Sequence, residues 1–188
     1  MNCIKCTTKS CRTAETCPAQ KFDASELIRT YHLPENTKII QAAAQLVDNG
    51  RAGTLSRLQE VIEFSKSMKF QRIGIAYCYG MERESALIAT IFKESGFKTY
   101  PVSCTTGGFK QSEINHGSNI EKVSCNPLAQ AGQLNAESVD FTITVGLCMG
   151  HDILFNKYIK SYTTTLIVKD RVHDHNPSAA INIANDLN

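Results

Sequence analysis

The chain has no long apolar run and no apolar segment at its start. No stretch approaches the roughly 20 apolar residues that a bilayer-spanning helix needs. The opening sequence, MNCIKC, lacks the apolar core of a signal peptide. We therefore expect a cytoplasmic protein with no membrane partner.

The chain also has little net charge, with a formal value of +2 in 188 residues. This charge is too small for the basic surface of a nucleic-acid-binding protein. There is no Walker A sequence, and the pair Gly146 and Gly150 lacks the third glycine of a dinucleotide-binding loop. No Ser-His-Asp spacing or paired carboxylate pattern indicates a hydrolase. The sequence therefore predicts neither a nucleic-acid partner nor a nucleotide cofactor.

Cysteine, in contrast, is abundant, with eight residues. In a reducing cytoplasm, metal ligands or reactive thiols explain this number better than disulfides do. Cys3, Cys6, Cys11 and Cys17 lie in the first twenty residues, with polar residues between them. Thiolates so close in sequence can surround one Zn²⁺ ion or iron–sulfur cluster, and a disordered tail with spare thiols is the alternative. We predict a cysteine-rich metal-binding segment at 1–20.

Residues 21–188 have the pattern of an α/β domain that begins with helices. Apolar residues recur at helical spacing from Ser25 to about Phe70, with a break at Pro34 and with Thr54 as the expected cap of the last of these helices. Short apolar runs then alternate with helical stretches, which predicts a mostly parallel sheet in three layers, Rossmann-like or flavodoxin-like. The expected strands are 73–77, 99–103, 141–145 and 165–168, with a short extended piece at 122–124.

The other four cysteines each follow one of the expected extended segments: Cys78, Cys104, Cys125 and Cys148. In an open parallel sheet, ligands bind beyond the carboxyl ends of the strands, so these side chains are expected to converge on one pocket. We predict that they bind a cofactor, either an iron–sulfur cluster or zinc. The alternative for each of them is burial in the core as a small hydrophobic residue.

Histidines lie near the same predicted edge. His151 follows Cys148 at the expected start of a helix, where it could orient a ligand or move protons, and a surface role is the alternative. Cys78 and His151 are the candidates for a catalytic residue. His173 and His175 form a His-x-His pair, which we interpret as part of a solvated loop rather than as a metal site.

Three further motifs give the chain a family resemblance: CNPLAQA at 125–131, GLCMGHD at 146–152, and VKDRV at 168–172 followed by HNP at 175–177. With these and its cysteine-rich start, the chain resembles, over nearly its whole length, a prokaryotic family of uncharacterised metal-binding proteins (domain of unknown function 1847). The resemblance implies metal binding without a reaction, and it supports Cys125, Cys148, His151 and His175 as motif positions. His173 departs from the family pattern, which weakens a His-x-His metal site further.

Three hypotheses follow, and they leave open whether the chain is an enzyme. The first is a metal-binding protein with two thiolate sites that acts as a redox or binding module and has a redox partner. The second is an iron–sulfur enzyme of sulfur chemistry, of the desulfidase or sulfur-transfer type, in which Cys78 or a sulfur-containing small molecule reacts at an open iron. The third is a zinc-stabilised interaction protein with merely buried core cysteines.

Overall fold

The computed structural model describes residues 2–186 of the chain. These residues form two compact units, divided between Ala44 and Gln45. The predicted division into 1–20 and 21–188 separates a metal-binding segment from the α/β domain. It rests on metal binding by the first twenty residues, and it stays a prediction. Within residues 2–186, none of the helices combines the length and the apolar character that crossing a bilayer requires.

The first unit begins with irregular chain that contains a short 3-10 helix, η1 (Ser10–Arg12), and continues with α1 (Ala24–Tyr31) and most of α2 (Pro34–Val47), which ends just past the division. Asp23 caps α1, because its carboxylate accepts hydrogen bonds from the N–H groups of Ser25 and Glu26 at 2.8 and 3.1 Å. Among the described residues of this unit, only Ala42 is buried. The cysteine-rich start is therefore not organised around an apolar core.

The second unit contains a four-stranded parallel sheet with the strand order β2-β1-β3-β4. The strands are β1 (Arg72–Tyr77), β2 (Lys98–Ser103), β3 (Phe141–Val145) and β4 (Tyr162–Ile167). The helices are α3 (Arg57–Ser67), η2 (Tyr79–Met81), α4 (Glu82–Glu94), α5 (Gln111–Ile114), α6 (Pro127–Ala136), α7 (His151–Tyr158) and α8 (Pro177–Asp186). The predicted three-layer α/β arrangement is confirmed.

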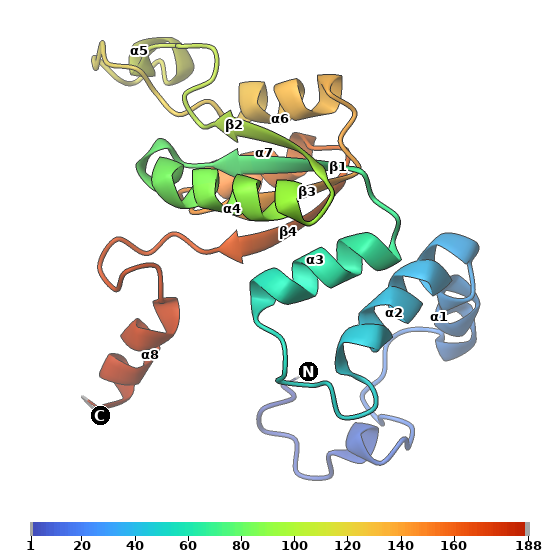
Figure 1. Ribbon diagram of the computed structural model, residues 1–188. Helices are drawn as coiled ribbons and strands as arrows, with labels where there is room; N and C mark the ends of the chain where they lie inside the picture. Colours follow the sequence, from blue (N-terminus) through green and yellow to red (C-terminus); the bar gives the residue numbers. More distant parts are fainter. Residues whose placement is uncertain (1, 187–188) are drawn as a thin grey trace. The chain divides into compact units, whose positions relative to one another are not determined.

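Helices cover both faces of the sheet, because successive residues of each strand point to opposite sides. On one side, Ala76 of β1 packs in a buried cluster with Leu134 of α6 and Phe155 of α7. On the other side, the ring of Phe141 in β3 lies 6.1 Å from the ring of Phe64 in α3. Figure 1 shows α4 and α6 on opposite sides of the sheet.

The sheet and α6 approach each other closely at Gly74 in β1. A Cβ atom at this position would lie 2.8 Å from Thr142 Oγ1 and 3.1 Å from Leu134 Cδ2. The first contact is too short for a Cβ atom and the second is unusually tight, so the missing side chain lets β1 lie close to both Thr142 of β3 and Leu134 of α6. This packing sets the height of α6 above the sheet.

Two predictions about local structure were wrong. The cap of α3 is Ser56 and not Thr54, because Ser56 and Gln59 exchange the two hydrogen bonds of a capping box, whereas the Thr54 hydroxyl bonds back to the carbonyl of Arg51 at 2.7 Å. The extended piece at 122–124 is not a strand of the sheet. It makes an isolated antiparallel bridge between Val123 and Lys110.

Candidate thiolate site

Cys78 and Cys104 lie next to each other at the carboxyl edge of the sheet. The last paired residues of β1 and β2 are Tyr77 and Ser103, so the two cysteines are the next residues of both strands. Cys78 N donates to the carbonyl of Val145 at 3.0 Å, and Cys104 N donates to that of Tyr77 at 2.8 Å. The hydrogen bonding of the sheet therefore continues through both cysteines and holds their backbones in place.

Cys125 reaches the same edge from the loop that precedes α6. Asn126 N donates to the carbonyl of Cys104 at 2.6 Å, and the sulfur of Cys125 lies 3.4 Å from the sulfur of Cys104. The prediction that Cys125 ends a strand was wrong, because the segment before it pairs only with Lys110 in the loop. Its contact with Cys104 comes from the loop and not from the sheet.

The start of α6, which follows Cys125 directly, is anchored to the ends of two strands. Gln130 is fully buried, and its Nε2 donates to the carbonyls of Tyr77 at 3.1 Å and Val102 at 2.7 Å. The Asn126 side chain caps the helix by accepting from Ala129 N at 3.0 Å. The sequence indicates Gln130 only as part of the family motif at 125–131, and the structure gives it a positioning role.

Cys148 lies on the loop between β3 and α7. The loop turns at Gly146, whose φ of 60° favours glycine and where a Cβ would lie 2.8 Å from Met81 Cγ. The guanidinium Nη2 of Arg171 donates to the sulfur of Cys148 at 3.0 Å. Arg171 was not selected from the sequence, although its place in the loop after the last strand and inside the motif at 168–172 is a signal that could have found it.

Burial and neighbouring sulfurs raise the pKa values of two core cysteines, Cys104 and Cys125. Burial raises the pKa of the Cys104 thiol to about 12, and negative charge on Cys125 and Cys78 raises it as well. Burial also raises the pKa of Cys125, where Cys148 and Cys78 act in the same direction. The N–H of Tyr79, which donates to the sulfur of Cys104 at 3.3 Å, opposes the effect of burial there. Negative charge at this edge is therefore costly unless a cation compensates it.

The loop after β4 carries Arg171 and is held by its own residues. The carboxylate of Asp170 accepts from the N–H groups of Val172 at 2.9 Å and His173 at 3.0 Å, and His175 Nδ1 accepts from Asp170 N at 3.2 Å. The His-x-His pair thus serves the turn that positions Arg171, as the interpretation of a loop role implies.

His151, a catalytic candidate, is the first residue of α7. Its Nδ1 atom is buried, and it has no hydrogen-bond partner within residues 2–186. Its predicted role in orienting a ligand or moving protons stays a prediction.

Comparison with known proteins assigns the chain to a family. The family model described as a protein of unknown function (DUF1847) matches residues 15–166. The chain belongs to this family. An uncharacterized protein of Methanocaldococcus jannaschii is 42% identical over 186 residues, which cover 96% of this chain and 93% of the relative. No solved structure matches the chain.

The part of the chain that matches DUF1847 contains the four core cysteines and Cys17, whereas Cys3, Cys6 and Cys11 precede it. Cys3 and Cys11 are exposed, and Cys6 and Cys17 are partly exposed. The backbone N–H of Lys9 and then the Thr8 hydroxyl lower the pKa of Cys6. Across residues 2–186, neither cysteine set brings three or more His, Cys, Asp or Glu side chains into a group that could hold a metal ion. Metal binding by either set therefore stays a prediction.

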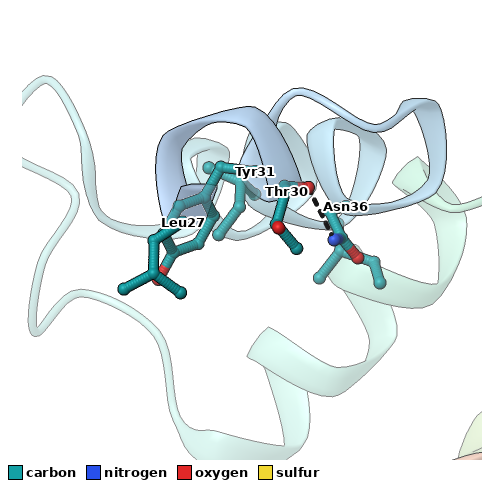
Figure 2. A pocket seen from close by; sticks show the side chains of 6 residues that line it. Leu27, Thr30, Tyr31 and Asn36 are labelled. Carbon is teal, nitrogen blue, oxygen red and sulfur yellow. Dashed lines mark hydrogen bonds between the residues drawn. The ribbon is translucent and has the colours of Figure 1, made fainter. Parts of the chain in front are cut away.

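Two hollows lie away from the sulfur atoms. One, of about 90 Å³, borders the Cys148 loop and is lined by Thr144, Leu147, Met149, Asp152, Thr165, Ile167, Val168 and Lys169. The other, of about 320 Å³, belongs to the helical unit and is lined by Leu27, Thr30, Tyr31, Asn36, Ile39 and Ile40. Figure 2 shows the hydrogen bond from Asn36 to the carbonyl of Thr30 beside it. Neither lining contains a cysteine.

Proposed function

We propose that this protein holds a metal centre, zinc or an iron–sulfur cluster, through Cys78, Cys104, Cys125 and Cys148, and that it serves as a redox or binding module. The observation that carries the proposal is the 3.4 Å contact between the sulfurs of Cys104 and Cys125. Two thiolates on one tetrahedral zinc ion lie about 3.8 Å apart, given a Zn–S bond of about 2.3 Å. The contact is therefore close to the spacing that a shared ion requires.

The electrostatics of the edge also support a bound cation. Thiols with raised pKa values, as at Cys104 and Cys125, stay protonated until a positive charge stabilises their thiolates. The N–H of Tyr79 and the guanidinium of Arg171 each donate to a sulfur of the set. Donors of this kind orient thiolate ligands and offset their charge.

The metal centre supplies either electron transfer, as an iron–sulfur cluster, or structural closure, as zinc. The chain contributes the rest. Cys78 and Cys104 are only 5% and 2% exposed, so the protein keeps water from this side of the site. Cys148 is partly exposed and lies on the accessible side, beside Arg171.

That accessible side favours a second candidate, an iron–sulfur enzyme of sulfur chemistry. The sequence suggests Cys78 as the residue beside an open iron, but Cys78 is buried. Cys148 is more accessible, and its guanidinium neighbour would attract an anionic substrate. In this candidate Cys148 and Arg171 would face the incoming substrate.

The test is the metal and sulfide content of anaerobically purified protein, together with its absorption spectrum. We expect Cys104→Ser with Cys125→Ser to remove the core metal, and the matched control Cys3→Ser with Cys6→Ser to leave it. A visible absorption that disappears only in the core variant indicates an iron–sulfur cluster, whereas colourless metal-loaded protein indicates zinc. Unchanged metal content in the core variant would overturn the proposal.

A further inference from the structure

We propose that Cys104 and Cys125 also form a dithiol site that exchanges with low-molecular-weight disulfides and closes a reversible disulfide across the edge of the sheet. This inference goes beyond the proposed function and does not depend on it. It rests on the 3.4 Å contact between two free sulfurs from segments that the backbone holds together. A disulfide needs a sulfur–sulfur distance of about 2.05 Å, so the two sulfurs have to approach by little more than about 1 Å to bond.

The backbone around the pair is fixed independently of the sulfurs. Cys104 N donates to the carbonyl of Tyr77 at the end of β1. The carbonyl of Cys104 accepts from the backbone N–H of Asn126, which directly follows Cys125. Gln130 ties the same helix start to both strands. Closing the bond therefore requires no rearrangement of the sheet or of α6.

The two sulfurs differ in access, which assigns their roles. Cys104 is 2% exposed, whereas Cys125 is partly exposed. A small disulfide can reach Cys125 first, and Cys104 lies behind it. Cys125 is therefore the attacking thiol, and Cys104 is the resolving thiol.

The exchange is balanced in two steps. Cys125 loses its proton to solvent, attacks one sulfur of the small disulfide R–S–S–R and forms a mixed disulfide, which releases R–S⁻. The Cys104 thiolate then attacks the sulfur of Cys125, forms the internal bond and releases the second R–S⁻. The two protons from the protein thiols convert both leaving groups to R–SH, so the protein is oxidised by two electrons and R–S–S–R is reduced.

The bond would close the segment between Cys104 and Cys125, which is otherwise joined by the isolated Lys110–Val123 bridge and by neighbouring backbone hydrogen bonds. It uses the same two sulfurs as the proposed metal centre. Metal binding and disulfide formation are therefore mutually exclusive at this edge, and an oxidant would release or block the metal.

The experiment uses the full chain, stripped of metal by a chelator, reduced, and then incubated with glutathione disulfide. After N-ethylmaleimide quenching and digestion, mass spectrometry maps the links. We expect a Cys104–Cys125 link in most molecules, both in the wild-type chain and in the control variants Cys78→Ser and Cys148→Ser. In Cys104→Ser, we expect glutathione to remain attached to Cys125.

Wild-type mapping decides the matter even if Cys104→Ser does not fold. A chain in which Cys125 stays free, or links mainly to Cys78 or Cys148, would overturn the inference.

Loading the protein with zinc before adding the oxidant separates the two proposals. Suppression of the link supports both, whereas a link that forms equally with zinc present supports the dithiol and counts against the core metal centre. Failure of the link in metal-free protein overturns the dithiol alone, because metal content is measured separately.

Discussion

The two sets of four cysteines differ in the way that each is brought together. Cys3 and Cys6 belong to a set that is compact in sequence, but the described structure places no two of its sulfurs in hydrogen-bonding contact. Cys104 and Cys125 are separated by a long loop, yet their sulfurs touch. Local spacing predicts the first set as the more compact site, whereas the fold brings the sulfurs of Cys104 and Cys125 in the second set into contact.

The difference arises from what holds each backbone. Cys78 and Cys104 follow directly after Tyr77 and Ser103, which pair with each other in the parallel sheet. The strand register therefore fixes the two cysteine backbones side by side. The hydrogen bonds within residues 2–20 are local, such as that from Cys6 N to Cys3 O at 3.4 Å. The cysteine-rich start therefore depends on local bonds, whereas strand pairing holds the carboxyl edge of the sheet in place.

The largest predicted difference between the sets is in thiol reactivity. In reduced, metal-free protein at neutral pH, we expect iodoacetamide to modify Cys6 about a hundredfold or more faster than Cys104, because the thiolate reacts and burial disfavours it at Cys104. A raised pKa means a smaller thiolate fraction, so the Cys104 rate should rise about tenfold per pH unit up to a pKa of about 12. Peptide mapping by mass spectrometry measures both rates. Equal rates at neutral pH would contradict the contrast.

Substitution of Gly146 should weaken the folded state around Cys148 without affecting the N-terminal cysteines, which lie in the other unit. In Gly146→Ala, the new Cβ meets Met81 Cγ at 2.8 Å and the backbone keeps a φ of 60°, so we expect a loss of about 2–4 kcal/mol in unfolding free energy. Urea unfolding measures this loss, and metal analysis should show weaker binding at the core.

Gly150→Ala is the matched control for Gly146→Ala. Gly150 also has a positive φ, of 83°, but nothing lies within 4 Å of a Cβ there. We expect only the backbone cost, about 1 kcal/mol. Similar losses in both variants would show that the contact with Met81 has no influence on the core loop.

Loss of the Asp170 carboxylate should loosen the turn that aims Arg171 at Cys148. In Asp170→Ala, we expect the reaction of Cys148 with anionic iodoacetate to fall a few-fold relative to neutral iodoacetamide, because the guanidinium no longer attracts the anion. The control is Asp174→Asn, which removes a charge from the same loop and suits the φ of 48° there. An unchanged ratio in Asp170→Ala would contradict this positioning.

The stability of the same turn should decrease at low pH, because it depends on the charged carboxylate of Asp170. The N–H groups of His173 and Val172 lower the pKa of Asp170. The contribution of the carboxylate to the turn is therefore fully present above its ordinary value of 3.8, and it is lost as the pH falls through the lower value of the folded protein. The pH dependence of the Val172 and His173 amide chemical shifts, followed by NMR, measures this loss.

The smallest expected effect belongs to the N-terminal set. Cys3→Ser with Cys6→Ser should change the unfolding free energy of the sheet-containing unit by less than about 0.5 kcal/mol, since these side chains lie in the other unit. The same variant should lose any metal uptake by residues 1–20. A large loss of sheet stability would mean that the two sets are coupled.

The sheet could be predicted because its central strands are apolar and buried. The prediction for β3 matched Phe141–Val145, where every residue is buried. The start of β4 at Tyr162 was missed, because Thr163, Thr164 and Thr165 interrupt the apolar signal in a partly exposed edge strand. Burial on both faces gives a strand a continuous apolar sequence, and an edge strand lacks that signal.

Less of the candidate site could be predicted, because loops build half of it. Parallel topology is enough to place Cys78 beside Cys104. The contacts of Cys125 with Cys104 and of Arg171 with Cys148 depend on loop conformations that leave no periodic pattern in the sequence. The buried amide of Gln130 was likewise recognisable only as part of a family motif.

Gly74 gives the core site a mechanical dependence on a position in the middle of β1. The missing side chain lets Leu134 rest against the strand, and the helix that carries Leu134 begins directly after Cys125 and Asn126. A methyl group added at Gly74 would press on Leu134, and we expect it to shift α6, whose first turn follows Cys125. The close packing at Gly74 therefore connects a position in the middle of β1 with the helix that begins after Cys125 and Asn126.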